Sequence, residues 1–182
     1  MSTAASCDAC KRDPDTHSFS YVTKWATYHV YYTSFAKLKD IANSEAILAH
    51  IRGALAPIGA EPWLWVVDCD AFAMKHAMSL KALMDIARFM RDNYAHQLAG
   101  MYILNSGTLL KGTIGHIMPM FDATFQRKLT YLSGSALQLM PELEKIGWGR
   151  TETTVLVATI AAHRAGGMRP PTGGTSPLAP LK

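Results

Sequence analysis

Two short apolar runs and the amphipathic stretch between them constrain the fold of this chain most. The runs are Trp63 to Val67 and Met101 to Leu104, and each is continuously apolar, as is typical of a strand covered on both faces. Between them, apolar residues recur at helical spacing from Ser79 to Tyr94, and Ser79 can cap that helix. Strands that alternate with helices predict an α/β fold built on a largely parallel sheet.

The other segments of the chain extend this alternation. Trp25 to Thr33 is rich in Tyr, Val and Thr, which favours a strand. Asn43 to Leu55 has apolar residues at helical spacing, and Asn43 or Ser44 can cap it. The remaining predicted elements are a helix over 109–121, a third inner strand over 127–132, a helix over 136–145, and a segment over 153–162 that could be helix or strand.

Length and composition predict one domain between two tails. A chain of 182 residues suffices for one domain with a substantial core. Residues 1–20 are polar, and we expect a flexible N-terminal tail there. Residues 166–182 are rich in Pro and Gly, which cannot bury enough surface to become ordered. The expected organisation is therefore a flexible tail (1–20), a ligand-binding domain (21–165) and a disordered tail (166–182).

Charge and hydropathy limit the partners. The net charge is +4, all of it contributed by residues 101–182, and no run of Lys or Arg exceeds two. This pattern argues against a nucleic acid partner, and it is compatible with weak attraction to an anionic membrane surface. The apolar runs are much shorter than the roughly 20 residues of a membrane span, and the N-terminus lacks the pattern of a signal peptide. We expect a cytoplasmic protein.

Cysteine and histidine spacing predicts no metal site and no cofactor. Cys7 and Cys10 form a single C-x-x-C in the polar tail, whereas a structural zinc site needs four ligands and usually two such pairs. Cys69 lies in a buried run and is predicted to be an inert core thiol. The seven histidines show neither His-x-His nor a pair four residues apart.

An enzymatic alternative arises where the first apolar strand ends in Asp68-Cys69-Asp70. A buried strand that ends in Asp-x-Asp resembles the opening motif of haloacid-dehalogenase-type phosphatases, in which the first Asp is the nucleophile and the second an acid or base. Ala71 and Phe72 stand where Gly-Thr is typical, and the late acidic pair of that family is missing. The structural alternative is that Asp68 and Asp70 accept backbone N–H bonds in the turn.

The helix predicted over 109–121 has the features of a mobile lid. It carries an apolar stripe, which by itself indicates core packing. Gly107, Gly112 and Gly115 weaken it, since glycine inside a helix costs up to about 1 kcal/mol relative to alanine. Pro119 interrupts it just before Met120 and Phe121. A weak helix with a hinge is suited to cover a binding site.

The order of these motifs resembles the CRAL-TRIO lipid-binding domain of cytosolic phosphatidylinositol- and phosphatidylcholine-transfer proteins and of retinal- and tocopherol-binding proteins. That family has an aspartate-ended strand, a long helix, a central strand, a proline hinge and a lysine-bearing strand. In this chain, similar segments occur in the same order from Tyr28 to Gly147, namely Val66-Val67-Asp68, Ser79–Tyr94, Tyr102-Ile103-Leu104-Asn105, Met118-Pro119-Met120-Phe121-Asp122 and Lys128-Leu129.

The resemblance implies a largely parallel sheet with flanking helices and a helical gate over an apolar pocket. The implied function is non-enzymatic binding, and transfer between membranes, of a hydrophobic ligand such as a phospholipid. Lys128, with Ser106, would meet the polar end of the ligand. The expected wall residues are Val67, Leu104, Leu110, Ile114, Ile117, Met118, Phe121, Phe125, Leu129 and Tyr131.

The same resemblance leaves a second alternative open. Some relatives of this fold, and the similar STAS domains, have a filled interior and act through protein partners. An expected lack of the family's N-terminal helical lobe favours such an interaction module, because an uncovered apolar face then needs a partner. For the lipid-binding alternative, we expect a cytoplasmic protein with transient contact to the membrane surface.

Overall fold

The computed structural model describes residues 7–13 and 16–165, and its centre is a five-stranded sheet. The strands follow in chain order across the sheet, with β1 antiparallel to β2 and the other neighbours parallel. The largely parallel sheet predicted from the sequence is therefore confirmed. The strands are β1 (Ser20–Trp25), β2 (Tyr28–Ser34), β3 (Trp63–Asp68), β4 (Leu98–Leu104) and β5 (Leu129–Leu132).

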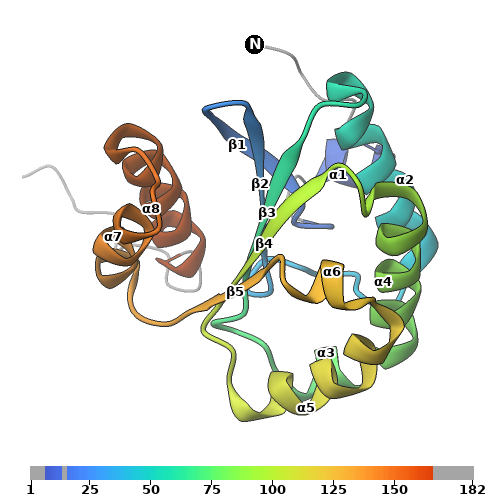
Figure 1. Ribbon diagram of the computed structural model, residues 1–182. Helices are drawn as coiled ribbons and strands as arrows, with labels where there is room; N and C mark the ends of the chain where they lie inside the picture. The colour runs from blue at the N-terminus through green and yellow to red at the C-terminus, as the bar shows by residue number, and fades with distance from the viewer. Residues whose placement is uncertain (1–6, 14–15, 166–182) are drawn as a thin grey trace, which may run out of the picture.

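The helices form two layers, one on each face of the sheet (Figure 1). Right-handed crossovers between parallel strands that are added in one direction place their helices on the same face. The connections from β2 to β5 supply that layer, with α2 (Ser44–Leu55), η1 (Ala56–Ile58), α3 (Met74–Ala77), α4 (Leu80–Tyr94), α5 (Thr108–Ile117), η2 (Met118–Met120) and α6 (Ala123–Gln126). The opposite face is covered by α7 (Ala136–Lys145) and α8 (Arg150–Ala165).

Local sequence signals explain several helix boundaries. The Asn43 side chain accepts a hydrogen bond from the Ala46 backbone N–H and so caps α2, as predicted. Pro119 lies in the short helix η2, which follows the end of α5 at Ile117, so the predicted interruption is also confirmed. Ser79 occupies the N-cap position of α4 but makes no side-chain cap; its hydroxyl donates to the Lys75 carbonyl instead.

Three segments differ from the sequence-based expectation. The strand predicted from Trp25 to Thr33 is the second half of a hairpin, because the chain turns at Ala26, which has a φ of 50°. The ambiguous segment 153–162 is helical and belongs to α8. The predicted flexible tail over 1–20 is wrong for its described part, which contains α1 (Asp8–Arg12) and the buried side chains of Cys10, His17 and Phe19. The predicted tail 166–182 lies outside the described residues.

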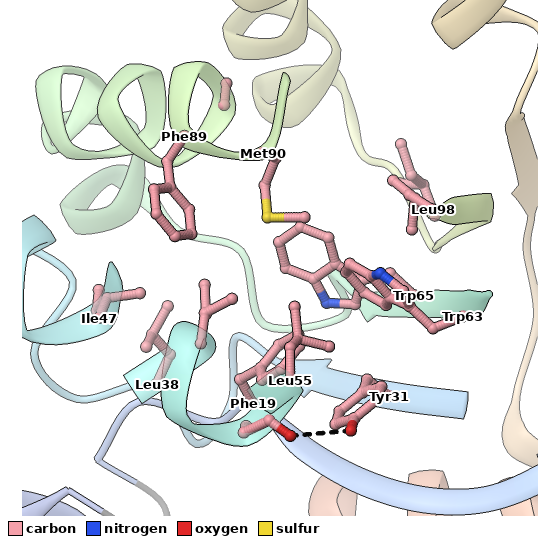
Figure 2. Close-up of a cluster of buried hydrophobic side chains, with 14 of the residues drawn as sticks. Phe19, Tyr31, Leu38, Ile47, Leu55, Trp63, Trp65, Phe89, Met90 and Leu98 are labelled. Carbon is pink, nitrogen blue, oxygen red and sulfur yellow. Dashed lines mark hydrogen bonds between the residues drawn. The ribbon is translucent and has the colours of Figure 1, made fainter. Parts of the chain in front are cut away.

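Each face of the sheet has its own apolar core. On the α7–α8 face, the core contains Val30, Leu64, Val66 and Leu104, which pack against buried side chains of the two helices. The other core lies under α2 and α4 and is rich in aromatic rings (Figure 2). There the Tyr31 hydroxyl satisfies its hydrogen-bonding need by donating to the Ala54 carbonyl, at 3.0 Å. This second core encloses an apolar cavity.

Candidate functional site: an apolar pocket beside the sheet

An apolar cavity of about 160 Å³ lies between the sheet and the layer formed by α2, α4 and α5. Its floor comes from strands β2, β3 and β4, through residues such as Trp65 and Ile103. Its walls come from helices α2, α4 and α5. No Lys, Arg, Asp or Glu is among the described residues that line it, and His17 and Thr33 are its polar members. The Thr33 hydroxyl already accepts a hydrogen bond from the Trp65 indole, at 2.9 Å.

Eight of the twelve residues expected at the site line this cavity. Most of them come from α5 and the segment after it, which form one wall of the cavity. These eight residues are Val67, Leu110, Ile114, Ile117, Met118, Phe121, Phe125 and Leu129. The cavity is nevertheless smaller than the several hundred Å³ that a pocket for a whole ligand usually has. In this conformation the helices are therefore closed over the sheet.

Leu104 and Lys128 do not line the cavity, contrary to expectation. Successive side chains of a strand point to opposite faces, so Ile103 faces the cavity while Leu104 is fully buried on the α7–α8 face. The Lys128 ammonium donates to the carbonyls of Ala95 and Leu98, at 2.7 Å each. Ala95 is the C-cap residue of α4, where a cation is favourable, and Leu98 is the first residue of β4. Lys128 therefore stabilises a helix end instead of facing the pocket.

Ser106 and Tyr131 also lie outside the cavity lining. Ser106 follows the carboxyl end of β4 and is half-buried. Tyr131 pairs in register with Ile103, but it lies on the edge strand β5, and 49% of its surface is exposed. An edge strand has a neighbour on one side only, which explains this exposure.

Several cavity residues were not predicted as site residues. They come from α2, from α4 and from the N-terminal segment, and include Phe19, Ile47, Ile51, Leu83, Ala87 and Met90. The apolar stripe of 79–94 was visible in the sequence as a core-facing stripe, but a stripe does not show whether it faces a filled core or a cavity. Phe19 gave no signal, because it lies in a polar segment without periodicity.

The α5 wall of the cavity has the structure expected of a weak helix. Gly112 and Gly115 lie inside α5, and a Cβ added at either position would contact no other atom within 4 Å. No packing requirement therefore explains why these positions are glycine. Inside a helix, each glycine is less favourable than alanine by up to about 1 kcal/mol. The wall nearest to Pro119 therefore combines two glycines with an interruption of the helix.

Asp68, the last residue of β3, forms a buried ion pair with Arg164 of α8, on the face of the sheet opposite the cavity. Arg164 binds both of its carboxylate oxygens, with Nε–Oδ2 and Nη2–Oδ1 distances of 2.8 and 2.9 Å. The Tyr32 hydroxyl also donates to Oδ2, at 2.8 Å, and the Asp70 backbone N–H donates to Oδ1. A carboxylate held in this way has no oxygen directed at a substrate. The phosphatase alternative based on Asp68 and Asp70 is therefore not supported.

The electrostatics of this cluster agree with a structural role. Burial raises the pKa of the Tyr32 hydroxyl, and the neighbouring Asp68 charge raises it further, so Tyr32 remains a hydrogen-bond donor. Burial by itself would lower the pKa of Arg164, but the hydrogen bonds and charge of Asp68 outweigh it and raise the pKa. Asn105, at the end of β4, donates to Asp70 and to the Gly134 carbonyl, which links the cluster to the turn before α7.

Comparisons with known proteins bear on strands β2 to β5 and on the helices from α2 to α7. Residues 24–146 match the family model of the CRAL/TRIO domain. The fold is similar to the crystal structure of a protein named Sfh5, with a TM-score of 0.54 and 13% sequence identity. The similarity covers 65% of this chain and 49% of that protein, so the chain spans about half of its length. No curated protein sequence matches.

Proposed function

The chain belongs to the CRAL/TRIO domain family, and from that premise we propose that its pocket binds the hydrocarbon part of a lipid, such as a phospholipid, for transfer between membranes. The family is one of lipid-binding and lipid-transfer proteins. The observation that carries the proposal is the apolar cavity, which lies against the sheet under α4 and α5 and has no charged residue in its described lining.

The chemistry of the lining fits an acyl chain. Burial of hydrocarbon stabilises a complex by about 0.8 kcal/mol per CH₂ group, so a long chain needs few polar contacts. The described lining consists of aliphatic, aromatic and sulfur-containing side chains apart from His17 and Thr33. The described lining contains no Lys, Arg, Asp or Glu, and this is the basis for proposing a non-enzymatic role. An interaction module with a filled interior is not favoured, because the interior has a cavity.

Ligand entry requires the pocket to enlarge. Pockets for drug-sized ligands usually have volumes of about 300–1,000 Å³, whereas this cavity has about 160 Å³. We infer that α5 and η2 act as the gate, since Gly112 and Gly115 weaken this helix and Pro119 interrupts it. A displacement of α5 would join the cavity to the surface without disturbing the sheet.

The polar end of the ligand lies outside the pocket in this proposal. Lys128 is engaged by two carbonyl groups near the end of α4 and does not supply a headgroup contact from inside. We therefore propose recognition of the hydrocarbon part, with a headgroup that remains at the gate. Specificity for a particular headgroup does not enter the proposal.

A membrane-contact face is proposed next to the gate. Met74 and Met78 are 61% and 80% exposed, and Leu109 on the neighbouring helix α5 is 37% exposed. The end of α3 and helix α5 line a shared groove, so these side chains lie close to the gate. Helices α3 and α5 carry lysine but no acidic residue, which suits an anionic surface. In the part of the chain that the structure describes, no helix is long and apolar enough to span a bilayer.

The pocket is tested by filling it. Ala87 on α4 is buried and lines the cavity, and an Ala87→Phe substitution would place a ring in it. We expect uptake of a phosphatidylcholine with a fluorescent acyl chain to fall about tenfold or more, the equivalent of losing two buried CH₂ groups. Native mass spectrometry of the wild type is expected to show co-purified lipid.

The matched control is Ala161→Phe, which adds the same ring at an exposed position of α8. This variant should take up the fluorescent lipid like the wild type. A wild type that carries no lipid, takes up none and is unaffected by Ala87→Phe would overturn the proposed function. Circular dichroism establishes that both variants are folded.

The membrane-contact face is tested by a charge change at Met78. Met78→Glu should reduce binding to vesicles that contain phosphatidylserine, because it replaces an exposed apolar side chain by an anion. The control is Leu137→Glu, since Leu137 is 78% exposed but lies on α7, in the opposite helix layer. Equal loss of vesicle binding in both variants, or no loss in either, would remove α3 from the proposed face.

A further inference from the structure

Four side chains outside the functional site converge at the N-terminal end of the described fold. They are Cys7, Cys10, His17 and His50, and their nearest ligand atoms all lie within 4.8 Å of one another. The first three come from the segment around α1, and His50 comes from α2. None of them has a role in the family function proposed above, although His17 also borders the pocket.

Three of the four side chains are buried, Cys7 is half-buried, and a ring nitrogen of the cluster has no hydrogen-bond partner among the described residues. Cys10, His17 and His50 are 4%, 2% and 8% exposed. The His50 Nε2 atom lies 2.7 Å from the Phe19 carbonyl oxygen. Because a carbonyl only accepts, Nε2 carries the proton and Nδ1 carries the lone pair. That Nδ1 atom is buried and has no hydrogen-bond partner among the described residues. An unpartnered ring nitrogen beside two thiols has the lone pair that a metal ligand requires.

The distances within the cluster fit a tetrahedral ion. The His17 Nδ1 atom lies 3.2 Å from the Cys7 sulfur and 3.5 Å from the Cys10 sulfur. Metal bonds of about 2.3 Å to sulfur and about 2.0 Å to nitrogen, at a tetrahedral angle, place such atoms about 3.6 Å apart. The Cys10 backbone N–H points at the Cys7 sulfur, at 3.5 Å, as expected for a group that stabilises a thiolate. Small adjustments would therefore complete the coordination.

We propose that Cys7, Cys10, His17 and His50 bind one Zn²⁺ ion in a structural site. Two thiolates and two imidazoles in a tetrahedral arrangement are a donor set that selects zinc among the common divalent ions. All four positions are filled by protein, so no position remains for a reacting water. The Phe19 carbonyl is the outer partner that fixes the His50 ring, in the manner usual for metal-bound histidine.

The zinc ion would fasten the N-terminal segment to the wall of the pocket. This segment already contacts the end of β2 and the loop after it, through the Ser34 N–H to the Ser18 hydroxyl and the Lys39 N–H to the Thr16 carbonyl. Phe19, two residues after His17, stacks on Tyr31 and lines the cavity. Zinc would add a fixed link from α1 to α2 across this region. Zinc removal should therefore loosen the segment that carries Phe19.

The sequence pattern concealed this site. Linear zinc motifs place two histidines three to five residues apart, whereas His17 and His50 are separated by strands β1 and β2. The single C-x-x-C gave two of four ligands, which is insufficient by itself. The prediction of no metal site therefore rested on sequence spacing, and the fold supplies the other two ligands.

Metal analysis of the full chain tests the proposal. The protein is purified with a reducing agent and without added chelator, and its zinc is measured by elemental mass spectrometry. We expect about one zinc per chain in the wild type and a loss of about tenfold in Cys10→Ser and in His50→Ala, because each removes one of four ligands. The controls are Cys69→Ser, which changes the cysteine outside the cluster, and His116→Ala, at an exposed position of α5. Both should retain zinc.

A second measurement covers the case in which the variants fold poorly. Wild-type protein stripped of metal and loaded with Co²⁺ should show the visible absorption of a tetrahedral cobalt ion and a thiolate charge-transfer band, and Zn²⁺ should abolish both. A chelator should lower the Tm of the wild type, and zinc should restore it. Zinc-free wild type without these cobalt bands would overturn the proposal. A Cys7–Cys10 disulfide in place of the free thiols, or equal zinc in Cys10→Ser and wild type, would overturn it as well.

Discussion

The two faces of the sheet are built for different purposes. On the α7–α8 face, Leu139, Leu143, Leu156 and Ile160 are fully buried. On the α2–α5 face, the core surrounds a cavity and is covered by a helix with two glycines for which no packing reason exists. Figure 1 shows that the sheet separates these layers completely. One face therefore carries fully buried side chains of α7 and α8, and the other surrounds a cavity beside a helix with two glycines.

The connection between the layers is polar. Asp68 at the end of β3 pairs with Arg164 near the end of α8, and Arg164 also donates to the Gly134 carbonyl. This pair fastens the layer of α7 and α8 to the sheet at the carboxyl end of β3. A ligand could thus displace α5 while α7 and α8 remain in place. The following predictions test this division between the faces.

The largest expected effect is on the α7–α8 face, from Asp68→Ala. This change leaves the Arg164 side chain, of which 14% is exposed, without its carboxylate partner. Loss of one partner of a buried ion pair costs about 3–5 kcal/mol, so we expect the free energy of unfolding in urea to fall by that amount. The control is Asp85→Ala, which removes exposed pairs with Lys81 and Arg88 and should change stability little. Similar losses in both variants would contradict the assigned role of Asp68.

The next effect compares the same substitution on the two faces. Leu156→Ala removes a fully buried side chain of α8 and should cost about 2–5 kcal/mol. Leu129→Ala acts on a half-buried residue that already borders the cavity, and we expect a cost below about 2 kcal/mol. Leu156→Ala should lower the free energy of unfolding in urea more than Leu129→Ala does. Leu129→Ala should reduce uptake of the fluorescent phosphatidylcholine more, because only Leu129 lines the pocket. The comparison fails if Leu156→Ala alters uptake more than Leu129→Ala does in folded protein.

The smallest expected effect is a gain in stability from Gly112→Ala or Gly115→Ala. Each added methyl group has free space, and alanine favours a helix over glycine by up to about 1 kcal/mol. A firmer α5 should also slow lipid exchange, measured by stopped-flow fluorescence. Gly147→Ala is the control, since Gly147 has a φ of 99° with equal free space, and alanine is strained there. Faster exchange in the α5 variants would argue against the gate.

Much of the fold could be read from local patterns. The continuous apolar run of β3 predicts a strand that is covered on both faces, and the Asn43 cap and Pro119 mark the beginning and end of helices. The stripe of α5 predicts residues that do line the cavity. Hydrophobic period and capping act within a few residues of the chain, so these signals survive without knowledge of the tertiary structure.

Side-chain direction in the central strands could not be predicted in the same way. Ile103 and Leu104 are both apolar because both faces of the sheet are covered, and a continuous apolar run carries no alternation. The sequence therefore did not show which of these two side chains points toward the pocket. The register against β3 and β5 decides this, and it places Leu104 on the α7–α8 face.

What the sequence determined by itself was the set of elements, their alternation and the weak apolar helix. What the tertiary structure decided was the partner of each polar side chain. Lys128 meets the end of α4, Asp68 meets Arg164, 96 residues further on, and the C-x-x-C of the N-terminal segment meets His17 and His50. Burial makes each of these groups costly without a partner, but the partner comes from a remote segment that only the folded chain brings near.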